Sequence, residues 1–129
     1  MTQHNSTDLD LSVGGTSMKA HIVDDVTLSI EAMTELATAF GDTWESHLFA
    51  GVKRAEPITV GGYYDDTAAT GPDAKFNVLG TTLTIVITWG GAKTSSFSAI
   101  AKKYDRIAKV GSMTRYIATI LPTGTITEA

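Results

Sequence analysis

The sequence predicts a mainly β protein, an antiparallel β-sandwich or barrel-like domain with one short flanking α-helix. Threonine is frequent in the 129 residues, and β-branched residues favour strands. Several stretches alternate apolar and polar residues, which is the period of a half-buried strand, and glycine-rich turns separate these stretches. The length is typical of one domain with one core.

The N-terminal residues 1–20 are polar and end in a Gly-Gly-Thr-Ser turn. They are too weakly apolar to form a core element, so we expect a flexible arm that is disordered unless a partner orders it. Residues 21–129 would then be the single folded domain. The first ten residues have neither a basic segment nor an apolar stretch, so we expect no secretory signal. The longest apolar run, 83–89, is too short to span a membrane, so we expect a soluble protein without membrane contact.

The residue pattern in the first half of the domain predicts two strands. Alternation over 26–32 favours a strand, although residues 33–40 switch to helical spacing, so a strand that runs into a helical turn is equally compatible. Residues 41–52 are expected to be an irregular, partly apolar connection. Residues 53–65 predict a broken strand, because Pro57 cannot donate to a ladder and the glycine pair at 61–62 indicates a bulge.

The second half begins with a helix predicted at 72–79. Pro72 suits the first helical position, Asp73 favours the positive end of the helix dipole, and Gly80 suits the end. A strand follows at 83–89, with a hairpin turn at the glycine pair 90–91 and a last strand near 114–121. For residues 95–110 the spacing of the apolar residues alone prefers a helix.

Patterns that carry catalysis or metal binding are missing from the sequence. There are no cysteines, and His4, His21 and His47 are scattered without metal-ligand spacing. The acidic pairs at 24–25 and 65–66 lack the spacing of a calcium loop, and no nucleotide-binding glycine pattern occurs. We therefore expect no enzymatic activity, no metal and no cofactor.

Charge is divided unevenly along the chain. Residues 1–73 hold twelve acids and three bases, a net −9, whereas residues 74–129 hold two acids and seven bases, a net +5. The total of −4 argues against a sequence-reading DNA-binding protein. Opposite poles suit head-to-tail association of identical copies, although a fold that interleaves both halves would mix the charges.

One segment resembles a known family. Residues 58–73, ITVGGYYDDTAATGPD, together with the later RYIATILPTG, resemble the major tail tube proteins of long-tailed, siphovirus-type bacteriophages. The resemblance extends from about residue 22 to 127. It implies a β-sandwich tail tube fold with one flanking helix, assembled as stacked rings, usually of six subunits, around a channel for double-stranded DNA. It also implies that residues 95–109 form a long strand, and we adopt the strand over the helix.

The resemblance makes self-association the expected function, in the virion tail tube after synthesis in the host bacterial cytoplasm. Expected partners are other copies, tape measure, tail terminator and distal tail proteins, while dsDNA would pass without sequence-specific binding. We expect the arm 1–20 and the loop 41–52 to become ordered between stacked rings. Candidate subunit-interface residues are Trp44, Phe49, Lys102, Lys103 and Arg106. Candidate lumen or loop acids are Asp65, Asp66 and Asp73, because a neutral or acidic channel lets DNA slide.

Two alternatives remain open. Another ring protein of a phage tail, such as a tail terminator or a distal tail adaptor, would form one ring and no long tube. A carbohydrate-binding β-sandwich would use the aromatic residues Tyr63, Tyr64 and Trp44 and would be a monomer.

Overall fold

The computed structural model describes residues 3 and 8–129. Their elements, in chain order, are β1 (Asp10–Val13), β2 (Thr16–Ser17), the 3-10 helix η2 (Lys19–His21), β3 (Ile30–Leu36), β4 (His47–Ala55), β5 (Ile58–Tyr63), α1 (Pro72–Phe76), β6 (Thr82–Gly90), β7 (Lys93–Ile107) and β8 (Arg115–Glu128). No helix among these residues is long and apolar enough to cross a membrane.

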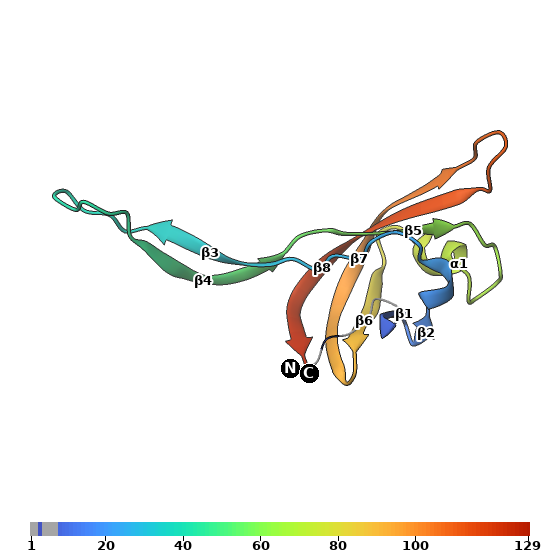
Figure 1. The fold of residues 1–129 in the computed structure, drawn as a ribbon, viewed down its shortest axis with the longest axis horizontal. Coiled ribbons are helices and arrows are strands. Elements are labelled where there is room, and N and C mark those ends of the chain that lie inside the picture. The colour runs from blue at the N-terminus through green and yellow to red at the C-terminus, as the bar shows by residue number, and fades with distance from the viewer. Residues whose placement is uncertain (1–2, 4–7) are drawn as a thin grey trace.

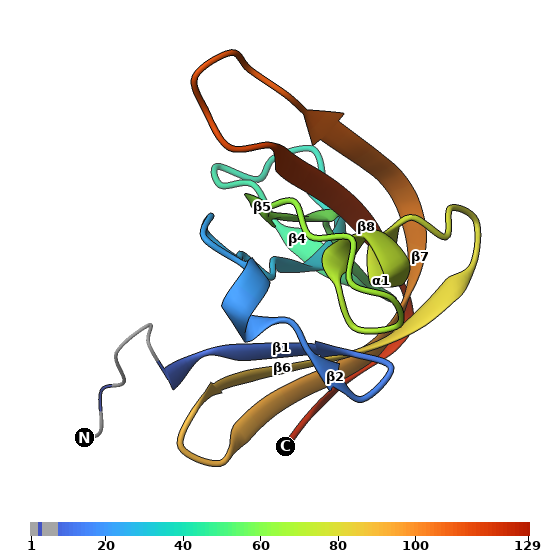
Figure 2. The same ribbon diagram turned by 90° about the vertical axis from the view of Figure 1, so that its right-hand side faces the viewer.

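The strands form two antiparallel sheets of unequal size. Six of the described strands make one sheet in the order β2-β1-β6-β7-β8-β5, and β3 pairs with β4 in a separate hairpin. The large sheet curls around α1 and η2, and the hairpin extends away from this body (Figures 1 and 2). The predicted fold class, mainly β and antiparallel with one short helix, is confirmed.

The core lies on the concave side of the curled sheet. Apolar side chains alternate along each strand, so that one face is buried and the other faces out. The fully buried members of the core include Leu11, Val13, Ile58, Val60, Ile85, Ile87, Ala99, Tyr116, Ala118 and Ile120. Trp89 packs at the margin of this core, where its indole Nε1 donates to Ser95 Oγ at 2.9 Å.

Tyr116 of β8 lies at the centre of the core. Its ring is stacked between those of Phe76 and Tyr104, each with a centroid distance of 6.0 Å. Its hydroxyl donates a hydrogen bond to the carbonyl oxygen of His21 at 2.8 Å. This side chain therefore ties together α1, β7 and the segment that follows β2.

The N-terminal segment differs from the sequence expectation. Residues 10–13 form β1, which pairs with β6, and Leu11, Val13 and Met18 are fully buried. The expectation that residues 1–20 hold no core element is therefore wrong, because β6 supplies a ready edge that three well-spaced apolar side chains can join. Residues 1–2 and 4–7 of the expected arm lie outside the described residues. Flexibility of the arm as a whole stays a prediction.

Several elements have different bounds from those predicted. The strand predicted at 26–32 is β3, Ile30–Leu36. Residues 47–52, expected as an irregular connection, belong to β4. The helix ends at Phe76, and the last strand continues to Glu128. The strand implied for 95–109 is confirmed as β7, with the hairpin turn at 90–91 before it.

The glycine pair of β5 permits a close approach rather than a bulge. The register of β5 on β8 is continuous through Gly61 and Gly62, so the predicted bulge is absent there. A Cβ atom at Gly62 would lie 1.8 Å from the His21 carbonyl oxygen, and one at Gly61 would lie 2.2 Å from Asp24 Oδ2. Only glycine lets residues 21–24 pass this close to β5, where the backbone nitrogen of Val23 donates to the carbonyl of Gly61 at 3.0 Å.

Candidate assembly surfaces

The described residues contain no cluster of three or more histidine, aspartate or glutamate side chains that could hold a metal ion. His21 Nδ1 lies 3.8 Å from Asp65 Oδ2, and His47 Nε2 lies 3.6 Å from Glu45 Oε2. His4 lies outside the described residues. The surface of the molecule has more distinctive features, which are exposed apolar side chains, separated charges and unpaired strand edges.

The β3–β4 hairpin is the most unusual surface, because it has no core of its own. Every residue of β3 is exposed, and so is almost all of β4. Among the candidate interface residues, Trp44 in the connecting loop is 85% exposed and Phe49 on β4 is 57% exposed. Two-stranded hairpins are at best marginally stable in water, and contiguous exposed apolar side chains mark interaction sites.

Both faces of this hairpin carry apolar side chains. Cross-strand partners share a face, so Ile30 and Ala55 lie on the same face as Phe49 and Thr34. The opposite face holds Leu48 together with the ion pair of Glu31 and Arg54, at 3.0 Å. A hairpin that packs on its own domain buries only one face, so its other face can be polar. Because both faces of this hairpin expose apolar side chains, both are suited to contact with other chains.

The second surface is the tip of the β7–β8 ribbon, residues 102–115. It holds the basic candidates Lys102, Lys103 and Arg106, all exposed. Lys103 Nζ lies 3.5 Å from Asp105 Oδ2, and Arg106 Nε lies 3.9 Å from Asp73 Oδ1. The tip lies at the opposite end of the molecule from the β3–β4 hairpin (Figure 1). The five candidate interface residues therefore form two separate surfaces, not one.

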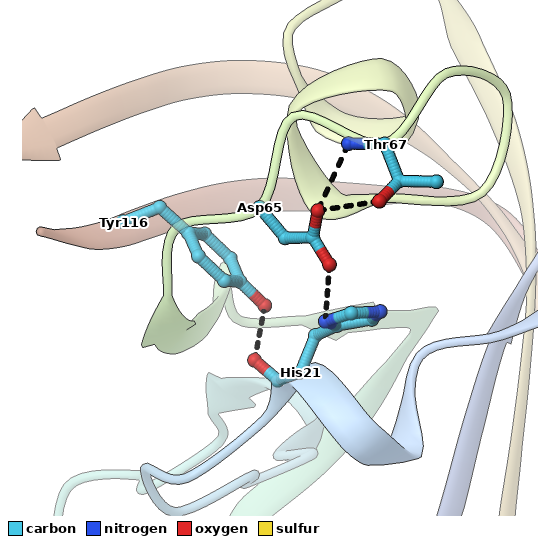
Figure 3. A network of polar contacts seen from close by, with 4 residues as sticks. All are labelled: His21, Asp65, Thr67 and Tyr116. Carbon is cyan, nitrogen blue, oxygen red and sulfur yellow. Dashed lines mark hydrogen bonds and ion pairs between the residues drawn. The ribbon is translucent and has the colours of Figure 1, made fainter.

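The candidate acids lie in α1 and in the segment that leads into it, and Figure 3 shows the contacts of Asp65. Asp65 Oδ1 accepts hydrogen bonds from the backbone nitrogen and the hydroxyl of Thr67, at 2.9 and 2.6 Å. These bonds, with a smaller effect of His21, lower the pKa of the Asp65 carboxyl below its ordinary value. Asp66 is exposed, and Asp73 lies in the first turn of α1. The acids are thus on the side of the sheet that α1 covers.

The convex face of the large sheet was not singled out from the sequence. Its outward positions on β6, on the first half of β7, and on β8 from Ile117 onward are uncharged. Most are hydroxyl residues, and we call this set the hydroxyl face: Thr82, Thr84, Thr88, Thr94, Ser96, Ser98, Thr119, Thr123 and Thr127. Threonine or serine at six of the nine even positions of 82–98 was the available signal.

Besides the outer edge of the two-residue β2, two longer strand edges of the large sheet have no backbone partner among the described residues. The β6 ladder on β7 ends at Ile100, so one edge of residues 102–107 is unpaired. The β5 ladder on β8 ends at Ile120, so one edge of residues 121–128 is unpaired. The second edge forms a wall of a groove whose other wall is the base of the hairpin, including Ile30 and Val52.

Comparison with known proteins shows which solved structures share this fold. No family model matches the sequence, and no curated protein matches it. Solved structures do match along the whole chain. A protein in the tail of an empty gene transfer agent particle, computed with helical refinement and C6 symmetry, is 15% identical with a TM-score of 0.77, covering 98% of this chain and 99% of that one. A protein in the virion of a native gene transfer agent particle has a TM-score of 0.80 at 15% identity, with the same coverage.

Further matches extend the same likeness. The SPP1 tail tube protein has a TM-score of 0.68 at 11% identity, over 98% of this chain and 78% of that one. A protein of the anti-feeding prophage baseplate has a TM-score of 0.69 at 8% identity, over 100% and 97%. At these identities the likeness concerns the fold alone. The curled antiparallel sheet, the small second sheet and the short helix together are the tail tube fold.

Proposed function

We propose that this chain is a tail tube subunit of a phage-like particle, which assembles into rings of six that stack around a channel for double-stranded DNA. The observation that carries the proposal is the β3–β4 hairpin, which extends from the body with apolar side chains exposed on both faces. Only neighbouring chains can cover both faces. The likeness to a tail with C6 symmetry supports the six-fold ring.

Ring closure would use the two unpaired strand edges. Residues 102–107 of β7 and 121–128 of β8 belong to different strands, so a contact between them joins unlike surfaces of two copies. Such head-to-tail contacts close into rings when the rotation allows, and closure removes the open edges. The groove beside β8 would receive the neighbouring strand, with Ile30 and Val52 contributing apolar surface.

The channel wall would be the hydroxyl face. Duplex DNA carries one charge per about 1.7 Å of its axis, so a wall of lysine and arginine would hold it at many phosphates. The outward positions at 82–100 include no charged residue, and hydroxyl groups exchange hydrogen bonds with water easily. In this arrangement Asp65, Asp66 and Asp73, on the side covered by α1, would face the outside of the tube.

Electron microscopy of the concentrated, purified protein tests the proposal. Hollow tubes with six-fold end views are the expected result, because the exposed apolar hairpin and the open edges favour contact between copies. Particles that remain monomeric at every concentration would refute it. Tape measure, tail terminator and distal tail proteins would be its neighbours in the particle. No step of this function requires catalysis.

A second candidate is a protein that forms a single ring. The likeness to the baseplate protein of the anti-feeding prophage favours it, and single rings without tubes would be its signature in the same micrographs. The carbohydrate-binding alternative has less support. Trp44 lies in the β3–β4 loop, whereas Tyr63 ends β5 on the body, so the aromatic residues do not form one platform.

A further inference from the structure

Two segments at opposite ends of the molecule have opposite charge. The hairpin end, residues 33–50, holds three acids (Glu35, Asp42 and Glu45) and neither lysine nor arginine, a net −3. The ribbon tip, residues 102–115, holds five basic residues and one acid, a net +4. Figure 1 shows the two segments pointing away from each other. They cannot neutralise one another within one copy.

Both segments also expose apolar side chains. In the hairpin end these are Met33, Leu36, Phe40, Trp44, Leu48 and Phe49, and in the ribbon tip they are Ile107, Val110 and Met113. Phe40 and Val110 are fully exposed. Each segment thus has the composition of an interface, in which apolar side chains are surrounded by charges of one sign.

Some of these charges have no partner of their own. Among the described residues, Glu35 and Asp42 make no ion pair, and neither do Lys102 and Lys109. The other bases of the tip are engaged at least in part, as in the 2.8 Å pair of Arg115 with Asp24. Glu35 and Asp42 in the hairpin end and Lys102 and Lys109 in the ribbon tip are therefore available to charges of another copy.

We propose that the hairpin end of one copy docks on the ribbon tip of a copy in the next ring. The inference rests on the proposed ring-forming function and names the contact that joins one ring to another. Because the contact joins unlike surfaces, a stack has free hairpin ends at one end and free ribbon tips at the other, so it can grow at both ends. Complementary charge sets the direction of stacking, while the apolar side chains supply the buried area.

Charge reversal tests the contact. The hairpin variant E35K/E45K changes its segment from −3 to +1 and keeps Asp42, whose carboxylate accepts the backbone N–H of Ala39 at 2.7 Å. The tip variant A108E/K109E/S112E/T114E leaves the ring-closing edge 102–107 unchanged and changes its segment from +4 to −1. Each variant alone brings like charges together. The combined variant restores opposite signs, and K19E/T59E/K93E is a control with the same charge change as the tip variant outside both segments.

Tube length in electron micrographs is the readout, with sedimentation at rising NaCl as a second measure. We expect single rings from either variant, tubes from the combined variant and tubes from the control. Tubes of unaltered length from either single variant at low salt would overturn the hairpin–tip contact and leave the tube function intact. A wild-type protein that forms neither rings nor tubes would overturn both.

Discussion

The hydroxyl of Tyr116 on β8 donates a hydrogen bond to the carbonyl oxygen of His21, 95 residues earlier in the chain, at 2.8 Å. The phenol is fully buried, so the bond satisfies a carbonyl that turns into the body where the N-terminal segment crosses β5. It fixes the start of the connection that leads to the β3–β4 hairpin. This hydrogen bond therefore helps to position the segment that leads to a candidate assembly surface.

Replacing this tyrosine by phenylalanine tests the bond. Tyr116→Phe keeps the stack with Phe76 and Tyr104 but removes the donor, and leaving a buried carbonyl without a partner costs about 1–3 kcal/mol. We expect the urea midpoint of unfolding to fall with an unchanged slope. An unchanged midpoint would show that the bond does not contribute to stability.

Alkaline pH should destabilise the fold through the same cluster. Burial raises the pKa of Tyr104 and of Tyr116 above the ordinary value of 10.0. The folded protein therefore holds these protons to higher pH than the unfolded chain does. This contribution to stability is complete below the unfolded pKa and is lost as pH rises through the folded one. The free energy of unfolding, measured with urea between pH 9 and 11.5, about where tyrosine titrates, should decline with rising pH. The decline should be smaller in Tyr116→Phe than in the wild type. Equal declines in the two proteins would contradict the contribution of Tyr116.

The close approach at β5 predicts the effect of a single methyl group. In Gly62→Ala the new Cβ would lie 1.8 Å from the His21 carbonyl oxygen, so residues 21–24 must move. Overpacking of this kind costs about 1–3 kcal/mol. Thr59→Ala, at an exposed position of the same strand, is the control and should change the unfolding free energy much less. A Gly62→Ala protein as stable as the control would mean that this contact is loose.

Trp44 separates assembly from folding. Its side chain is 85% exposed on the isolated copy, so Trp44→Ser should change the unfolding free energy of the monomer by no more than about 0.5 kcal/mol. The same change should weaken tube formation, because the exposed indole is available to neighbours. Trp89→Phe is the opposite case: it loses the hydrogen bond to Ser95, and stability should fall. Normal tubes from Trp44→Ser would remove this residue from the interface.

Local signals predicted the elements whose own side chains form the core. The alternation from Leu83 to Trp89 identified β6, and Pro72 with Asp73 identified the start of α1. In β7 the spacing of the apolar residues favoured a helix. The register shift between Ala101 and Lys103 is the cause, because beyond it the other set of alternate side chains faces the core. Phe97 and Tyr104 face the core while Ile100 faces out, which imitates helical spacing. A resemblance to known proteins was needed to overcome this signal.

The surfaces were harder to predict than the sheet. Residues 47–52 have no periodicity of burial because both faces of β4 are exposed on one copy, so the pattern resembled a loop. The sequence made Trp44 and Phe49 candidate interface residues, and both side chains are exposed on one copy, but their role in an interface stays a prediction. If neighbouring copies cover the hairpin as proposed, its apolar residues are of a kind that single-chain rules assign to a core or a loop.

The absence of cysteine makes the orientation of the sheet in a tube directly measurable. Thr84, on the hydroxyl face, and Ala68, in the loop before α1, are both exposed on one copy. If the hydroxyl face lines the channel, Thr84→Cys should react with a bulky maleimide before assembly but only with a small one afterwards, because water fills the channel. Ala68→Cys should react with both reagents in either state. Loss of the small reagent's access at Thr84→Cys would make the hydroxyl face a subunit contact, and a bulky label at Thr84→Cys on intact tubes would put it outside.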